Sequence, residues 1–473
     1  MTARIGAPIP LRAANLNAIG ALDLPTPHYD RNALVPRILH VGVGGFHRAH
    51  MALYTDEAAA AEGGDWGIRG AGLLDADRRM ADVLRAQDHL YTLIERDSNG
   101  SRARIVGSIV DYTLAAGDGS AFAERVADPQ VAILSLTITE GGYSLVNRNP
   151  TIEAIVAGLE ARRARPGAPL TILSCDNLPG NGDAARAAII AVAERHGAEL
   201  VRYVEACDFP NSMVDRITPQ TQDGDRKWLR DEIGVDDAWP VVCEPFRQWV
   251  IEDCFASGRP RWDNAGVLFT GRVHDWELYK LRMLNASHSC LAYLMALAHV
   301  VYVDEAVALA HVRSYLERFL TDEVIPTLVA IPGHPPAEYA ETVLRRFANT
   351  GVRDQIARLC SDGTSKLRSF LIPTVEAQLA RGGHVKCAAL ALAAWARYLA
   401  TVPPALRAPD SHGEHAAELA QRSLVEPAAF LDLEEVFTSF VRDSSLFRDE
   451  FTAAAAELAK LGPHRAIERV LTD

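Results

Sequence analysis

Four polar side chains that could do acid–base chemistry lie close together in the stretch VHDWELYKLRMLNASH: Glu277, Lys280, Asn285 and His288. At about 100° per residue they span an arc of roughly 140° on a helix, so they share one face. The sequence then turns apolar as far as Val303, which is typical of a helix enclosed by other helices. Because buried polar groups need partners or a ligand, the stretch predicts a site at the start of a buried helix.

These residue types suggest the oxidation of an alcohol. Burial can lower the pKa of a lysine from about 10.4 to roughly 7–8, where Lys280 could take a proton from a hydroxyl group. The Asn285 amide could hold the resulting alkoxide without protonating it, and His288 could donate to the same oxygen or its neighbour. A structural explanation stays open, in which Glu277 and Lys280 are an ordinary surface pair and His288 is a satisfied core histidine.

A dinucleotide site is indicated much earlier, in RILHVGVGGFHRAHMALYTDEAAAA. An apolar strand breaks at Gly42 and Gly44 and continues into an alanine-rich helix, so backbone N–H groups there could bind a pyrophosphate. The third glycine of the usual fingerprint is replaced by His47. We assign Gly42, Gly44, Gly45 and Phe46 to cofactor binding; the alternative is a tight turn between strand and helix.

The second expected strand, WGIRGAGLLDADRRM, ends in two acidic residues, Asp75 and Asp77. A carboxylate at this point should bind the adenosine ribose hydroxyls and repel a 2′-phosphate, which favours NAD over NADP. Arg78 and Arg79 leave the opposite preference open. Alternatively, both aspartates are solvated helix caps.

Two later segments, VAILSLTITEGGY and PLTILSCDNLPGNG, are continuous apolar runs that end in polar or glycine turns, as buried parallel strands do. Ligands of open parallel sheets bind beyond the carboxyl ends of the strands. This rule places Thr139 and Glu140 after one strand, and Asp176 and Asn177 after the next, near a bound nicotinamide. Asp215, in SMVDRITP, could form a salt bridge with Arg216.

From His274 onward the pattern is helical almost throughout, and within it LCSDGTSKLRSFLIPTV places Lys366 after a glycine turn, with Arg358 just upstream. These cations could bind the hydroxyls or a carboxylate of a small polar substrate, or could be solvated. We predict an α/β fold: a Rossmann-type, doubly wound parallel sheet domain followed by a mostly α-helical domain. The expected ranges are an N-terminal arm at 1–36, a dinucleotide-binding domain at 37–272 and a helical substrate domain at 273–473.

The composition is that of an ordinary globular protein, with 48% apolar and 23% charged residues. A net charge of −13 argues against nucleic acid or an anionic membrane as a partner. The seven cysteines show no CxxC pair, and the sequence has neither a signal-peptide core nor a membrane span. We therefore expect a cytoplasmic protein. The HGEH segment at His412 resembles metal-ligand spacing but lies among polar residues, and we predict no metal site.

Several segments carry a resemblance to a known family: HVGVGGFHRAH, TITEGGY, SCDNLPGNG, SMVDRITP, WVIED and above all KLRMLNASH. The sequence resembles the polyol-specific long-chain dehydrogenases, that is, the mannitol 2-dehydrogenase family with its arabinitol dehydrogenases and its fructuronate and tagaturonate reductases. The resemblance spans nearly the whole chain. The pattern of Lys280, Asn285 and His288 is that family's catalytic signature, and it is more specific than the glycine turn.

The resemblance implies a role for each matching residue. Lys280 would be the general base, with Asn177 and Asn285 as an oxyanion hole and His288 on the reacting oxygen. Glu277 would pass the proton to water. The remaining substrate hydroxyls would be bound by residues that match the family's polyol contacts, namely Asp215, Arg358 and Lys366.

The resemblance also implies the reaction, an NAD-dependent and metal-independent oxidation of a polyol to a ketose, with D-mannitol and D-fructose favoured. D-arabinitol 4-dehydrogenase and fructuronate reductase, which acts on D-mannonate, are alternatives within the family. A non-catalytic nucleotide- or sugar-binding protein is the alternative of another class. We expect a monomer or a small homo-oligomer whose partner is the small-molecule substrate.

Overall fold

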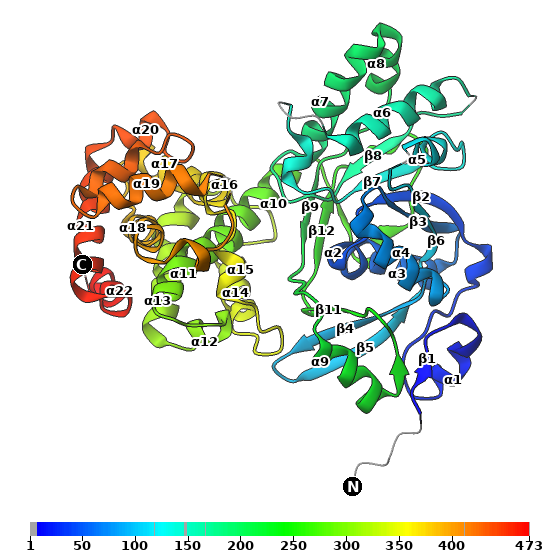
Figure 1. Cartoon of the computed structure of the whole chain (residues 1–473), viewed down its shortest axis with the longest axis horizontal. Helices are drawn as coiled ribbons and strands as arrows, with labels where there is room; N and C mark the ends of the chain where they lie inside the picture. Colours follow the sequence, from blue (N-terminus) through cyan, green and yellow to red (C-terminus); the bar gives the residue numbers. More distant parts are fainter. Residues whose placement is uncertain (1–6, 118, 146–148, 166, 411, 473) are drawn as a thin grey trace. The chain divides into compact units, whose positions relative to one another are not determined.

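The computed structural model of the chain describes residues 7–117, 119–145, 149–165, 167–410 and 412–472, and divides into two compact units, residues 1–274 and 275–473. We call these unit 1 and unit 2 and describe each by itself (Figure 1). Among the described residues, no helix is long and apolar enough to cross a membrane.

Unit 1 is built on a five-stranded sheet in the order β6-β3-β2-β7-β8, with every pair parallel. The chain runs outward from β2 to β3 and β6, then returns to place β7 on the free side of β2. This reversal creates a topological switch point between β2 and β7, where ligands of such sheets bind. The strands are β2 (Val35–Val41), β3 (Trp66–Gly72), β6 (Ile109–Leu114), β7 (Ile133–Leu136) and β8 (Thr171–Ser174).

Both faces of this sheet are buried, because neighbouring residues of β2, β7 and β8 enter different cores. Ile38 of β2 belongs to a core shared with helices α2, α3 and α4, whereas Leu39 belongs to one shared with α5, α6 and α7 (Figure 1). The predicted doubly wound fold is therefore confirmed. The helices are α2 (Gly45–Ala49), α3 (Met51–Glu62), α4 (Arg78–Ala86), α5 (Gly119–Val126), α6 (Pro150–Arg163) and α7 (Asn181–Ala193).

Three smaller sheets complete unit 1, in the orders β11-β4-β5, β13-β12-β9 and β1-β10. In the second of these, β9 runs antiparallel to β12, and Asp215 stands opposite Gln248. The strands are β1 (Ile9–Pro10), β4 (Tyr91–Asp97), β5 (Gly100–Val106), β9 (Ser212–Asp215), β10 (Val235–Asp236), β11 (Val241–Cys243), β12 (Gln248–Ile251) and β13 (Leu268–Phe269).

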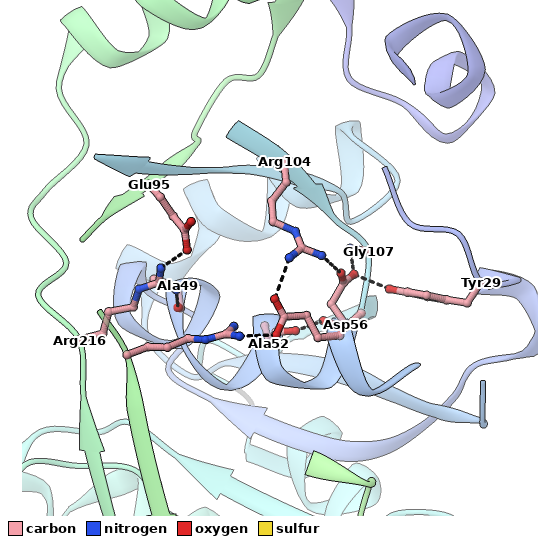
Figure 2. Close-up of polar contacts among 11 residues, drawn as sticks. Tyr29, Ala49, Ala52, Asp56, Glu95, Arg104, Gly107 and Arg216 are labelled. Atoms are coloured by element: carbon pink, nitrogen blue, oxygen red, sulfur yellow. Dashed lines mark hydrogen bonds and ion pairs between the residues drawn. The ribbon is translucent and has the colours of Figure 1, made fainter. Parts of the chain in front are cut away.

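Buried polar contacts attach the N-terminal segment and the smaller sheets to helix α3. The Asp56 carboxylate of α3 accepts hydrogen bonds from the Tyr29 hydroxyl and from the Gly107 backbone N–H at 2.7 Å, and pairs with Arg104 of β5 at 3.3 Å (Figure 2). Because Asp56 is only 1% exposed, losing any of these partners would leave a costly buried charge.

Unit 2 consists of helices from α10 onward (Figure 1). Its centre is α18 (Lys386–Thr401), which is buried along most of its length and packs against α11 (Ala286–Leu297) and α21 (Ser445–Leu461). In the described part of unit 2, three π-helical segments interrupt the α-helices: Lys280–Asn285, Phe319–Val324 and Leu367–Leu371. π-helical segments are rare in proteins, and those that do occur are often found at functional sites.

Candidate functional site

The glycine turn lies at the switch point between β2 and β7. Gly42 has φ +94°, and a Cβ atom there would lie 2.1 Å from the carbonyl oxygen of Thr137, the residue directly after β7. Only glycine fits both the backbone conformation and the spacing. The turn leads into α2 through Gly44, whose backbone is extended, and α2 begins at Gly45. The turn therefore has the form and place of a dinucleotide-binding turn, and the residues present fit NAD.

Two aromatic contacts hold the start of helix α2. The ring of Phe46 stacks on that of His50, with centroids 4.9 Å apart. The ring of His47, which replaces the third glycine of the fingerprint, is buried and stacks on His40 of β2 at 3.5 Å. The signal for His40 was present in the sequence as a polar residue inside an apolar strand, but our sequence analysis assigned it no role.

The two candidate ribose ligands differ in their surroundings. Asp77 Oδ2 accepts a hydrogen bond from the Leu74 backbone N–H at 2.9 Å and thus caps the helical turn after β3. The Asp75 side chain is 92% exposed, with a contact of 3.7 Å to Arg78. A surface pair of this kind contributes little, so Asp75 is the more available carboxylate for a ribose.

The loops after β7 and β8 are joined by one buried carboxylate. Asp176 accepts hydrogen bonds from the backbone N–H groups of Ile138 and Thr139, at 3.0 and 2.8 Å, and from the Tyr143 hydroxyl at 2.5 Å. These bonds hold Thr139 at φ +66°, an uncommon conformation for a non-glycine residue. Asn177 follows Asp176 directly and is partly buried. Tyr143 has a part in this geometry that the sequence analysis missed, whereas the Glu140 side chain lies outside the described structure.

Asp215 ends strand β9 and is 3% exposed. Its neighbour Arg216 pairs with Glu95 of β4 and donates to the carbonyl oxygen of Ala49 at 2.6 Å (Figure 2). Ala49 is the last residue of α2, so this arginine ties the strand that carries Asp215 to the helix that follows the glycine turn.

In unit 2, the predicted catalytic stretch is one continuous helix with a change of winding. α10 (Val273–Tyr279) passes into the π-helical segment Lys280–Asn285 and then into α11. On an α-helix, residues five apart would lie about 140° apart. A π-turn closes i→i+5, so Lys280 and Asn285 come nearer to one face than α-helical geometry gives. Glu277 and Lys280 are 4% and 8% exposed, so they are not an ordinary surface pair.

Asn285 and His288 each carry a buried polar atom that has no hydrogen-bond partner in the described part of the chain. The atoms are Asn285 Oδ1 and His288 Nε2. The His288 ring stacks on Phe347 with centroids 4.3 Å apart, which fixes its plane. Burial lowers the pKa of His288 to about 3, so the ring is neutral. Buried polar atoms of this kind are costly and mark a place where a ligand can bind.

The predicted substrate-binding cations lie near this histidine, since the charges of Asp354, Arg358 and Lys366 all act on the pKa of His288. Arg358 of α15 (Ile356–Leu359) forms a two-pronged ion pair with Asp354, with Nε 2.7 Å from Oδ1. Burial alone would raise the pKa of Asp354, but the hydrogen bond and charge of Arg358 outweigh it and lower that pKa. Lys366 Nζ donates to the Arg358 carbonyl oxygen at 3.3 Å.

Two other features bear on the choice of site. A cavity of about 850 Å³ in unit 2 is lined by the carboxyl end of α11, by α15 and by residues 401–403 and 406–409, on the opposite end of α11 from Lys280. The segment that resembled metal-ligand spacing holds His415, which bonds Glu435 at 3.0 Å. Among the described residues, no three His, Cys, Asp or Glu side chains form a group that could hold a metal ion.

Comparison with known proteins covers both units. Residues 36–264 match the mannitol dehydrogenase Rossmann domain and residues 272–459 match the mannitol dehydrogenase C-terminal domain. The mannitol 2-dehydrogenase of Cereibacter sphaeroides is 39% identical, over 94% of this chain and 98% of its own. That of Phaeosphaeria nodorum is 38% identical, over 98% of this chain and 85% of its own.

Two solved structures are similar over the whole chain. The ternary complex of Pseudomonas fluorescens mannitol 2-dehydrogenase with NAD and D-mannitol has a TM-score of 0.89 and 38% identity, covering 98% of this chain and 100% of that one. A D-sorbitol dehydrogenase in substrate-free form has a TM-score of 0.85 and 34% identity, covering 97% of this chain and 100% of that one.

Proposed function

This chain belongs to the mannitol dehydrogenase family and is an NAD-dependent polyol dehydrogenase, and we propose that it oxidises D-mannitol to D-fructose without a metal ion. The observation that carries the proposal is the group in unit 2. Buried Lys280 stands on a π-helical turn with Asn285, and Asn285 Oδ1 and His288 Nε2 are buried without a hydrogen-bond partner among the described residues. A binding protein needs no base beside such groups.

The residues of unit 2 are proposed to transfer the proton and to orient the reacting oxygen of the substrate. Lys280 takes the hydroxyl proton of the reacting carbon, and Glu277, one helical turn earlier, passes it on toward water. The Asn285 amide stabilises the alkoxide, while the neutral His288 ring holds the reacting oxygen. Asn285 and Lys280 then act on one oxygen, which is consistent with the π-turn that brings them toward one face.

The residues of unit 1 are proposed to bind the cofactor and part of the substrate. NAD, when bound, would supply the hydride acceptor for the carbinol carbon. The turn at Gly42 receives the pyrophosphate, and we propose Asp75 rather than Asp77 as the ribose ligand because Asp77 already caps Leu74. Asn177 contributes to the oxyanion hole, and Asp215 binds a substrate hydroxyl.

The ion pair of Arg358 supports a polyol over a uronate as substrate. A carboxylate substrate would require an arginine whose guanidinium can form two parallel hydrogen bonds with it. The Asp354 carboxylate already forms this pair of contacts with the Arg358 guanidinium. Arg358 and Lys366 are then better suited to neutral hydroxyl groups than to the carboxylate of D-mannonate.

The deciding experiment is initial-rate formation of NADH with D-mannitol, D-arabinitol, D-sorbitol and D-mannonate, repeated with NADP and after treatment with a chelator. Fastest turnover of D-mannitol with NAD, unchanged by the chelator, is the expected result. A preference for D-mannonate would overturn the substrate proposal, and activity lost to the chelator would overturn the metal-free mechanism. No turnover of any of the four substrates would point to a non-catalytic nucleotide- or sugar-binding protein.

All seven cysteines are free. Because proteins of oxidising compartments tend to pair their cysteines, we propose a cytoplasmic location, which cell fractionation would test.

A further inference from the structure

His40 lies in β2, the middle strand of the five-stranded sheet, and is fully buried. It stands in register with Ser135 of β7, the strand across the switch point. Its ring Nδ1 lies 2.9 Å from the Ser135 hydroxyl, and its Nε2 lies 3.1 Å from the Thr137 hydroxyl. The proposed reaction uses neither nitrogen.

The direction of these hydrogen bonds follows from the protonation of the ring. Burial lowers the pKa of His40 to about 3, so the imidazole is neutral and has one donor and one acceptor. The Thr137 hydroxyl donates to the carbonyl oxygen of Gly42 at 2.7 Å, so it accepts from His40 Nε2–H. Nδ1 therefore accepts from the Ser135 hydroxyl. The chain of donors runs from Ser135 through His40 and Thr137 to Gly42.

We propose that His40 is a positioning residue for NAD, because through Thr137 it fixes the Gly42 carbonyl and with it the turn that receives the pyrophosphate. The inference rests on the proposed function, since it takes NAD to occupy that turn. His40 also contacts the far side of the turn, because the His47 ring of α2 stacks on it at 3.5 Å. One buried ring thus holds both the strand that enters the turn and the helix that leaves it.

Breaking any link should disturb the turn more than the sheet. Without the Thr137 hydroxyl, the Gly42 carbonyl and His40 Nε2–H lose the group that bridges them and keep only the direct contact of the His40 ring with the Gly42 backbone. Buried polar groups that lose a partner cost more than the bond itself contributes. The strand pairing of His40 with Ser135 uses backbone groups and does not depend on the hydroxyl. We therefore expect the turn, rather than the sheet, to shift.

The test compares NAD binding by Thr137→Val, Thr137→Ser and His40→Phe in the full-length protein, by isothermal titration calorimetry. Valine keeps the shape of threonine without the hydroxyl, and phenylalanine keeps a ring to stack on His47. We expect Thr137→Val and His40→Phe each to raise the NAD Kd about tenfold or more, with Thr137→Ser within twofold of the wild type. The double variant should be no weaker than the weaker single variant, because both changes break one chain. The KM for NAD should rise in parallel, while kcat at saturating NAD changes much less.

Thr55→Val is the matched control. Thr55 is also a buried threonine of unit 1 that donates to a backbone carbonyl, that of Met51 at 2.9 Å, but it lies in α3, away from the turn. We expect Thr55→Val to lower the melting temperature and to leave the NAD Kd within twofold. An unchanged Kd in Thr137→Val, or an equal rise in Thr55→Val or Thr137→Ser, would overturn the role of the hydrogen-bond chain. A wild-type protein that fails to bind NAD would instead contradict the proposed function.

Discussion

The two units differ in which of their buried groups have hydrogen-bond partners. At the turn of unit 1, the Gly42 carbonyl is bonded by Thr137 and the N–H group of Thr139 by Asp176. The atoms there without a partner among the described residues belong to stacked histidine rings, namely His47 Nδ1 and Nε2 and His50 Nδ1. In unit 2, Asn285 Oδ1 and His288 Nε2 are buried without a partner in the described residues. Polar groups whose hydrogen bonds are complete hold a fixed geometry, whereas buried polar groups without a partner can still form a hydrogen bond with a ligand. The contrast suggests that unit 1 mainly holds the cofactor and that most of the reacting groups belong to unit 2, with Asn177 as the proposed contribution of unit 1 to the oxyanion hole.

Replacing Lys280 with alanine is the sharpest way to test this division. Loss of the base should lower kcat by about 10²–10⁴-fold. The NAD Kd should stay within about twofold, because the glycine turn that we propose as the cofactor site belongs to the other unit. Steady-state kinetics with D-mannitol and calorimetry with NAD measure the two quantities.

Lys460→Ala is the control for this variant, since Lys460 is an exposed lysine near the end of α21 and should leave both quantities unchanged. Near wild-type turnover by Lys280→Ala at neutral pH would show that another group is the base. A large loss of NAD affinity would remove the division of labour between the units.

Asn177→Ala and Asn285→Ala test whether the reacting groups are confined to unit 2. Each should lower kcat by about 10²–10³-fold with little change in KM, because an oxyanion-hole bond strengthens in the transition state. Steady-state kinetics with D-mannitol at saturating NAD measure both constants. A loss with Asn285→Ala but not with Asn177→Ala would leave the chemistry to unit 2 alone. An effect on KM only, in both variants, would argue against an oxyanion hole.

Gly42→Ala should show the reverse of Lys280→Ala, with its main effect on the NAD Kd. The added methyl group would meet the Thr137 carbonyl at 2.1 Å in a backbone conformation that alanine rarely adopts, so the turn must move. We expect the NAD Kd to rise by roughly 10–100-fold, as for a loss of about 1–3 kcal/mol of binding energy. Calorimetry measures it, and Gly271→Ala is the control, because a Cβ atom there meets nothing within 4 Å. Unchanged NAD affinity would place the cofactor elsewhere.

The sequence predicted what depends on periodicity and local turns. Apolar strands that end at Gly42 and beyond Leu136 indicated the parallel sheet, and the resemblance of KLRMLNASH indicated the family, as the structure and the comparisons confirm. The hydrogen bonds of His40 could not be predicted, because they depend on the register of β2 against β7, strands that lie about 95 residues apart in the chain.

The π-helical turn at Lys280–Asn285 could not be predicted either. Its residues are mostly good α-helix formers, so no local signal marks the altered winding. The roles of the individual site residues stay predictions, and the variants above decide them.

Glu323 shows that burial in unit 2 need not mean reactivity, and it yields the smallest of the expected effects. Its carboxylate is 4% exposed and accepts hydrogen bonds from the backbone N–H groups of Cys387 and Ala388, at 2.6 and 3.0 Å, where α18 begins. Burial outweighs these bonds and raises the pKa of Glu323 from 4.5 to about 8. Between these two values the folded protein keeps a proton that the unfolded chain releases, so the free energy of unfolding falls as pH rises.

From pH 5.5 to 7.5 this carboxyl group should lower the free energy of unfolding by roughly 2–3 kcal/mol. Glu323→Gln removes the titration, so its unfolding free energy should fall less than that of the wild type by this amount, with turnover of D-mannitol unchanged. Urea unfolding followed by helical circular dichroism measures the difference, and exposed Glu338→Gln should follow the wild type. Parallel pH profiles for wild type and Glu323→Gln would mean that Glu323 is ionised in the folded protein. The cap of α18 would then hold a buried charge through the two backbone N–H bonds and the Cys387 thiol, and its contribution to the stability of unit 2 would be the same at every pH in this range.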